Sequence, residues 1–238
     1  MGLPAIGLWP QRRAEIPATA SRFGGTPVAP PDWAWPAEEG EPLLFVGQIN
    51  CAELRGLPGA EVLPSSGLLA FFGSEEAMMT HYPDPHSCVF HWRDTDTLVP
   101  AVSSAPPNEI FPQCALLLRP MFELPHPYSR AVEELGLSSE RDLAYRDVWW
   151  EIHEHGIPKD SLGFVGFSKL LGWPSLIQND LDRFQLRDDS RLLLQADQYC
   201  NGEQSHHWWR GGSLYYALSD RDLQARIYDR CELECQFT

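Results

Sequence analysis

The sequence lacks any run of about 18 apolar residues, which excludes a helix long enough to span a membrane. It also lacks the Gly-x-Ser-x-Gly nucleophile elbow, the phosphate-binding P-loop and the glycine-rich dinucleotide pattern. These absences argue against the enzyme classes that those motifs define. An enzyme of another class stays open, because scattered Cys, His and Asp residues decide nothing by themselves.

Strong metal-ligand spacings are also missing, since there is neither a Cys-x-x-Cys pair nor a His-Glu-x-x-His motif. His81, His86 and His91 are spaced five residues apart, so on a strand successive histidines alternate between the two faces. We therefore expect no metal centre and no cofactor.

Targeting signals are equally sparse. Residues 1–10 have no basic start and no continuous apolar core, so we expect no cleaved signal peptide. The six cysteines are scattered through a chain large enough to fold without disulfides. The sequence therefore predicts reduced thiols and a cytoplasmic location.

The formal net charge is −15, from 33 acidic and 18 basic residues. Such a surface repels the phosphates of nucleic acids and anionic membranes, so we expect neither as a partner. It favours a basic protein partner, with simple solubility as the alternative explanation.

The two ends of the chain carry nearly the same pattern. Residues 42–72 contain PLLFVGQIN followed by SGLLAFF, and residues 191–218 contain RLLLQAD followed by GGSLYYAL. Each copy has an apolar run, a Gln-x-Asn or Gln-x-Asp triplet, and a Gly that precedes a second apolar run. This repetition predicts a duplicated strand-loop-strand unit.

The rest of the chain is assigned around these two halves. Residues 1–40 are proline-rich with tryptophan anchors, which predicts an extended arm packed on a single domain of residues 41–238. A strand at 114–118 is predicted to stop at Pro120. A helical insertion at about 128–156 has one apolar face, made of Tyr145, Val148, Trp149 and Ile152. The predicted fold class is α+β, antiparallel and β-rich, with internally duplicated halves and a helical insertion.

Four blocks together resemble the YwqG-like family, a widespread bacterial domain of unknown function. They are SRFGGTPVAPPDWAWP (21–36), PLLFVGQIN, LLGWPSLIQND (170–180), and LLLQAD with GGSLYYALSDRDL (192–223). The resemblance runs from about residue 21 to the C-terminus, and it implies an antiparallel, internally duplicated fold without an established activity.

The chain departs from that family in two places. The family's usual Gly-Asp pair before the last aromatic strand is absent from HHWWRGGSLYY (206–216), and its Gly-Gly-Tyr/His-Pro is replaced by LGWP at 171–174. Any ligand contact made by the missing Asp is therefore in question here.

The Gln-x-Asn/Asp triplet occurs three times, each time directly after an apolar run. On a strand, residues i and i+2 point to one face, so the pairs can converge in a polar pocket. The structural alternative is that these groups satisfy buried backbone, because an unpartnered buried polar atom costs about 1–3 kcal/mol. The residues in question are Gln48, Asn50, Gln178, Asp180, Gln195 and Asp197.

The leading hypothesis is a non-enzymatic binding protein, and more specifically an immunity protein that neutralises a basic interbacterial toxin. The YwqG-like resemblance contributes to it, because members of that family can occur beside toxin genes. Alternatives are a small-ligand binder or an uncharacterised hydrolase that uses the Gln-x-Asn/Asp face, and a homodimer that pairs sheet edges. The oligomeric state stays open. Candidate partner contacts are Glu75, Glu76, Asp84, Asp94, Asp96, Trp208 and Trp209.

Overall fold

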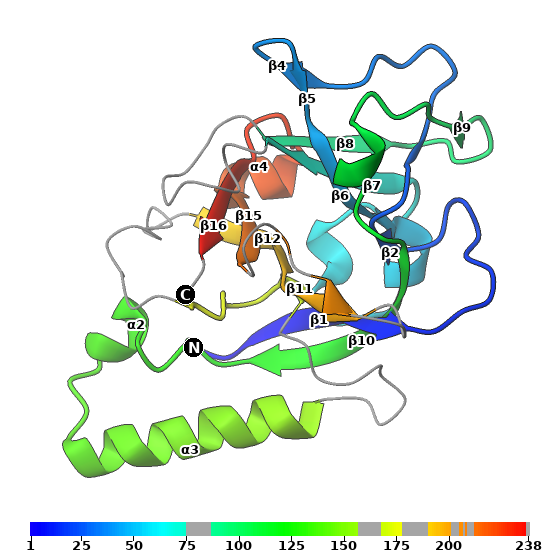
Figure 1. Ribbon diagram of the computed structural model, residues 1–238. Coiled ribbons are helices and arrows are strands. Elements are labelled where there is room, and N and C mark those ends of the chain that lie inside the picture. The colour runs from blue at the N-terminus through cyan, green and yellow to red at the C-terminus, as the bar shows by residue number, and fades with distance from the viewer. Residues whose placement is uncertain are drawn as a thin grey trace.

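The computed structural model (Figure 1) describes residues 1–74, 87–156, 168–177, 190–200, 205–206, 208 and 212–236. Its main feature is one ten-stranded sheet in the order β16-β15-β12-β11-β1-β10-β2-β6-β7-β8, in which every neighbouring pair is antiparallel. Its strands are β1 (Leu3–Gln11), β2 (Arg22–Phe23), β6 (Leu44–Asn50), β7 (Leu68–Gly73), β8 (Ser87–Trp92), β10 (Cys114–Glu123), β11 (Lys169–Leu171), β12 (Ser190–Ala196), β15 (Ser213–Ser219) and β16 (Glu232–Gln236).

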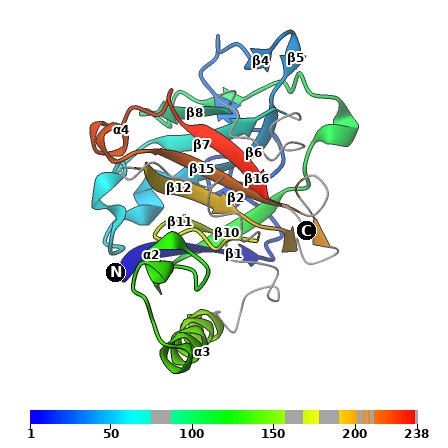
Figure 2. The same cartoon turned by 90° about the vertical axis from the view of Figure 1, so that its left-hand side faces the viewer.

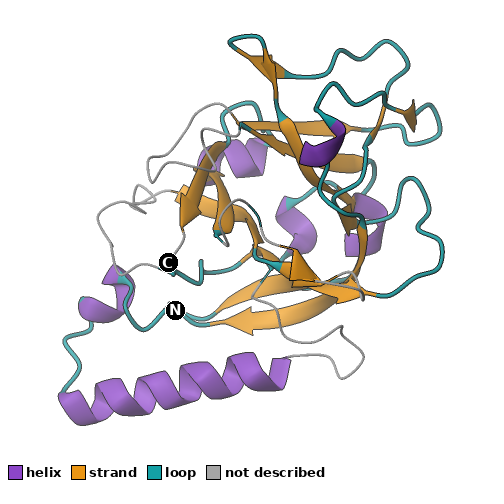
Figure 3. Ribbon diagram, in the orientation of Figure 1, coloured by secondary structure: helices purple, strands orange, loops and turns teal. Residues whose placement is uncertain are grey.

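Smaller elements complete the described part of the chain, which is dominated by strands (Figure 3). Three two-stranded ribbons pair β3 (Val28–Ala29) with β9 (Val99–Pro100), β4 (Ala37–Glu38) with β5 (Glu41–Pro42), and β13 (Tyr199–Cys200) with β14 (Ser205–His206). The helices are η1 (Cys51–Leu54), η2 (Ala60–Val62), η3 (Pro107–Glu109), α2 (Arg130–Glu133), α3 (Ser139–Gly156) and α4 (Asp220–Ala225).

The large sheet curls until it is nearly closed. Its two edge strands approach one another where Ser87 Oγ, on β8, donates a hydrogen bond to the carbonyl oxygen of Cys231 at 2.6 Å. Across the interior, the rings of Phe71 on β7 and Tyr216 on β15 have centroids 5.3 Å apart. This antiparallel, β-rich architecture with few helices confirms the predicted α+β class.

The sheet consists of two equivalent halves that meet between β1 and β10. One half has the order β10-β2-β6-β7-β8, and the other has the order β1-β11-β12-β15-β16. Each half carries an irregularity in the register at the same place, between Phe45 and Gly47 on β6 and between Leu192 and Leu194 on β12. The repeat seen in the sequence is therefore part of a larger five-strand unit.

The N-terminal segment differs from the predicted covering arm. Residues 3–11 form β1, which pairs with β10 along its whole length and with β11 through Ala5–Gly7. Leu8 N donates to Ser168 O at 2.9 Å, so alternate nitrogens of β1 face the β11 side. The nitrogens of Pro4 and Pro10 face that same side, and among the described residues β11 pairs only with Ala5–Gly7, so neither proline lies opposite β11.

Proline 120 does not stop its strand, contrary to the sequence prediction, and β10 runs on to Glu123. Leu116 N donates to Ser21 O at 3.1 Å on the β2 side, and the nitrogen of Pro120 faces the same side. Because β2 pairs with β10 only at Cys114 and Ala115, no strand among the described residues pairs with that side of β10 at Pro120.

The covering role belongs to residues that follow β2. The indole of Trp33 contacts the rings of Trp35, Phe72, Phe90 and Trp92, all with centroids within 5.8 Å. These rings form a second apolar cluster with Val28 and Leu43, separate from the main core inside the curled sheet. The outer face of β6, β7 and β8 is therefore buried as well.

The helical insertion follows β10 and lies outside the sheet, beside β1 and β10 (Figures 1 and 2). It docks through Tyr145 Oη, which donates to Pro125 O at 2.7 Å, and Trp149 Nε1, which donates to Leu124 O at 3.3 Å. Val148, predicted on the buried face, is 47% exposed. In the part of the chain that the structure describes, no helix is long and apolar enough to cross a membrane.

Candidate functional site

The first Gln-x-Asn triplet ties β6 to the segment before β2. Gln48 is fully buried, and its Nε2 donates to Ala18 O at 2.8 Å and to Ala20 O at 3.0 Å. Asn50 accepts a hydrogen bond from Ala52 N at 3.0 Å through its side chain, which caps η1. The backbone nitrogen of Asn50 donates to Ser21 Oγ at 2.9 Å.

The second triplet also fixes a loop in the other half, although its glutamine bonds a different segment. Gln195 is also fully buried; its Oε1 accepts from Ser175 N at 2.8 Å, and its Nε2 donates to Ser175 O at 3.2 Å. That Nε2 also donates to Asp197 Oδ1 at 3.1 Å, while Asp197 N donates to Ser168 Oγ at 2.9 Å. Ser168 thus takes the place that Ser21 has in the first half.

The two serines belong to a longer repeated motif that the sequence analysis missed. Ser-Arg-Phe-Gly-Gly-Thr-Pro at 21–27 matches Ser-Lys-Leu-Leu-Gly-Trp-Pro at 168–174. The backbone repeats as well, with φ of 61° and 72° at Gly24 and Gly25, and of 61° and 72° at Leu171 and Gly172. The same offset of 147 positions relates Gln48 to Gln195 and this motif to its copy. An alignment of the two ends of the chain at that offset could have revealed the motif.

Each half buries one cation directly opposite its glutamine. Arg22 pairs in register with Gln48, and its guanidinium donates to Ala18 O and Thr26 O, each at 2.5 Å. Burial lowers the pKa of Arg22 to about 10, because its charged form loses solvation.

Lys169 is the equivalent residue, since it pairs in register with Gln195. Its Nζ lies 3.0 Å from Glu123 Oε1 and donates to Ser175 Oγ at 2.7 Å. The lysine and the glutamate are 0% and 1% exposed, so this ion pair is shielded from solvent.

The predicted single pocket is therefore divided in its described part. Gln48 and Gln195 lie on β6 and β12, with β11, β1, β10 and β2 between them in the sheet, and each bonds within its own half. Gln178 and Asp180 lie outside the described residues. Gln48 and Gln195 hold loops against the sheet, Asn50 caps η1, and Asp197 accepts from Gln195. These contacts agree with the structural role that the sequence left open as an alternative.

The predicted partner contacts differ in their exposure. Asp94 and Asp96 are exposed in the turn after β8, where Asp96 N donates to Asp94 Oδ1 at 3.1 Å. Trp208 is a correction, because it is 0% exposed and its Nε1 donates to Asp197 O at 2.7 Å, so it is a core residue. The remaining candidates, Glu75, Glu76, Asp84 and Trp209, lie outside the described residues.

An acidic pocket of about 470 Å³ is the feature that sequence reasoning did not find. The β4–β5 hairpin supplies three of its glutamates, with φ of 47° at Glu39 and 93° at Gly40, as a tight two-residue turn requires. The fourth glutamate comes from the end of η3. The pocket is lined by Glu38, Glu39, Glu41, Pro42, Leu43, Leu44, Ser74, Ser104, Pro106 and Glu109.

The charge of this acidic pocket is one-sided. Among its lining residues, all within the described chain, none is Lys, Arg or His. Glu39 and Glu41 are exposed, and the apolar part of the lining includes Leu44, the first residue of β6 in the main sheet. Ser74 also lines the pocket and directly precedes the predicted contacts Glu75 and Glu76 in the sequence.

In the described ranges, no group of three His, Cys, Asp or Glu residues could hold a metal ion. The fold and pockets together define an internally duplicated α+β protein, built on a nearly closed antiparallel sheet that carries an acidic pocket. The chain belongs to the DUF1963 family, described as a domain of unknown function, whose family model matches residues 21–236. No curated protein matches this sequence.

Proposed function

We propose that this DUF1963 protein is a YwqG-like, cytoplasmic binding protein without catalytic activity, and that it neutralises a basic toxin of interbacterial competition. The acidic pocket receives a basic side chain of that toxin. The single observation that carries the proposal is a pocket lined by four glutamates and, among its lining residues, by no basic residue. A net charge of −15 on the whole chain adds long-range attraction.

The geometry suits a cationic side chain better than an anionic or apolar one. A lysine or arginine placed between the hairpin and η3 meets Glu39 and Glu41 from one side and Glu109 from the other. Complementary charge of this kind raises the association rate and selects the partner, and its effect decreases with added salt. The described Gln-x-Asn/Asp groups are a weaker basis for function, because they are buried or bond to nearby backbone, with Gln48 Oε1 as their one buried atom without a partner among the described residues.

The test is affinity capture from a lysate of the protein's own host, at low and then high salt, with mass spectrometry of the eluted proteins. We expect one basic protein that is released by salt. A triple variant, Glu39→Gln, Glu41→Gln and Glu109→Gln, is expected to weaken its binding about tenfold to a hundredfold, since each rim contact contributes about 0.5–1 kcal/mol.

A matched control separates the pocket from overall charge. The variant Glu15→Gln, Glu61→Gln and Glu140→Gln removes the same three charges from exposed positions outside the pocket. Capture of no basic protein, or equal weakening by both variants, would contradict the proposal.

A further inference from the structure

Helix α3 carries exposed apolar side chains on a side away from its contacts with the sheet. Leu143 and Trp150 are 61% and 52% exposed, and they lie seven residues apart, which is about two turns of a helix. Tyr145 and Trp149, which dock the helix, project from a different side. Figures 1 and 2 show α3 at the periphery of the molecule, with the sheet on one side of it. This side of α3 is therefore accessible to a partner.

Two charged residues lie between the two apolar ones. Arg146 and Asp147 follow Leu143 by three and four positions, the spacing that places helical residues on one side. We call Leu143, Arg146, Asp147 and Trp150 the α3 stripe. Its two charges are opposite, so the stripe is neutral within a protein whose net charge is −15. A neutral stripe gives a basic partner no electrostatic advantage at this position.

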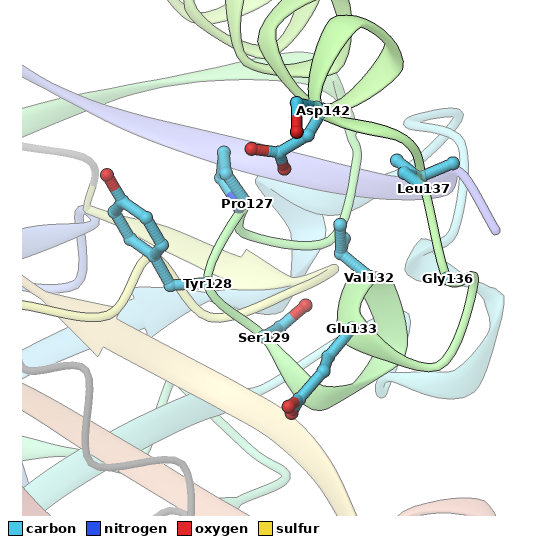
Figure 4. Close-up of a pocket in the computed structure, with 9 residues that line it drawn as sticks. Pro127, Tyr128, Ser129, Val132, Glu133, Gly136, Leu137 and Asp142 are labelled. Atoms are coloured by element: carbon cyan, nitrogen blue, oxygen red, sulfur yellow. The ribbon is translucent and has the colours of Figure 1, made fainter.

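Arg146 is held in place by residues outside the stripe. The segment before α2 and the first turn of α3 border a pocket of about 460 Å³ (Figure 4), and Tyr128 and Asp142 are among its lining residues. Asp142 Oδ2 forms an ion pair with Arg146 Nη2 at 2.8 Å, and Arg146 Nη1 donates to Tyr128 Oη at 2.9 Å. The Arg146 side chain is still 35% exposed. Because the guanidinium is already fixed, a contact with a partner costs it less conformational freedom.

The α3 stripe is complementary to a second copy of itself. In two antiparallel helices related by a two-fold axis, residues that lie equally far before and after the axis face each other. With the axis beside the peptide bond between Arg146 and Asp147, Arg146 of each copy faces Asp147 of the other copy. Leu143, three positions before Arg146, then faces Trp150, three positions after Asp147. One register thus matches the opposite charges and the apolar side chains together.

We propose that this protein forms a two-fold symmetric homodimer in which the α3 stripes of two copies pack antiparallel. Trp and Arg, both present in the stripe, are among the residue types that dominate interface hot spots. A single pair of helices buries less than the roughly 800 Å² per partner of a stable interface, so the dimer is weak, with a Kd on the order of 100 μM.

The proposed dimer does not depend on the proposed toxin binding. The β4–β5 hairpin of the acidic pocket lies at the other end of the molecule from α3 (Figure 1). Both acidic pockets are therefore uncovered in the dimer, and a loss of one interaction leaves the other intact.

The first measurement is sedimentation velocity of the purified protein from about 5 to about 500 μM in physiological salt, where a Debye length of about 8 Å screens the net charge. We expect the sedimentation coefficient to rise with concentration from that of a monomer towards that of a dimer. This measurement needs no variant. A monomer throughout the concentration range would overturn the proposal.

A double variant then locates the interface. Leu143→Glu with Trp150→Glu is expected to weaken association at least about tenfold, because like charges replace the apolar contacts. The matched control, Val99→Glu with Val102→Glu, adds the same two charges at exposed positions away from α3 and should leave the dimer unchanged. A dimer that persists in the α3 variant, or an equal loss in both variants, would contradict the proposal; persistence would point to another interface, such as paired sheet edges.

An exchange of charges tests the antiparallel register. Arg146→Asp and Asp147→Arg each place like charges opposite one another, so each variant alone should associate about tenfold more weakly. In an equimolar mixture, every Asp of one variant faces an Arg of the other, and association should return towards that of the unchanged protein. Circular dichroism checks that Arg146→Asp, which also loses its contacts with Asp142 and Tyr128, is folded. Two folded variants that gain nothing on mixing would overturn the proposed register.

Discussion

The buried ion pair between Lys169 and Glu123 gives the sharpest stability test. Its atoms are 3.0 Å apart and both side chains are at most 1% exposed, while Lys169 also donates to Ser175 Oγ at 2.7 Å. Lys169→Met keeps the length of the side chain but leaves the Glu123 charge buried without its cation. Removing one partner of such a pair costs about 3–5 kcal/mol, a large share of the roughly 5–15 kcal/mol by which proteins are stable.

The assay is urea unfolding at pH 7, followed by tryptophan fluorescence. We expect Lys169→Met to lower the free energy of unfolding by about 3–5 kcal/mol, and the double variant with Glu123→Gln to recover part of it, because the buried charge is then removed. The control is the surface pair of Arg191 and Asp220, 2.9 Å apart and 48% and 43% exposed, where Arg191→Met is expected to cost at most about 1 kcal/mol. A loss for Lys169→Met no larger than that of the control would refute the reasoning.

Three further predictions follow from the same structure. Ser21→Ala and Ser168→Ala should each lower the free energy of unfolding by a similar amount, about 1 kcal/mol, since each removes one equivalent hydrogen bond; clearly unequal losses in urea unfolding would argue against equivalent halves. Trp208→Ala should cost about 3–5 kcal/mol in the same assay, whereas Trp150→Ala, at a side chain 52% exposed, should cost much less; the reverse order would contradict the core position of Trp208. Burial raises the pKa of Cys51 from 9.0 to about 12, so above pH 9 the unfolded state loses this proton first and stability should fall as pH rises toward 12; a constant urea midpoint from pH 8 to pH 11 would disagree.

The sequence predicted the strands whose partners lie close along the chain. The apolar runs that became β6, β7, β12 and β15 are buried on both faces, so their composition alone was sufficient. The residues around β1 could not be assigned in this way, because Pro4 and Pro10 signal irregular structure. These prolines fit a central strand because β11 pairs only with Ala5–Gly7, between them. That pairing is a long-range contact, which local sequence patterns do not predict.

The acidic pocket depends on contacts that sequence spacing does not contain. The acidic pocket requires a hairpin with a left-handed Glu39 and a glutamate, Glu109, from a separate helix. The exposure of Val148 was not predicted either. Because α3 docks through Tyr145 and Trp149, it buries a narrower stripe than its apolar pattern indicates.

The central position of β1 limits the order in which the strands of the large sheet can pair during synthesis. The strands β2, β6, β7, β8 and β10 follow β1 in the sequence and precede β11, so the first half is fully synthesised before any strand of the second half other than β1. The next strand of the second half is β11, and it pairs with β1, the first strand to be synthesised. When β11 is synthesised, β1 can already be paired with β10. The other edge of β1 is then available to pair with β11. The first strand to be synthesised, β1, therefore gains its second neighbour, β11, only after the whole first half has been made.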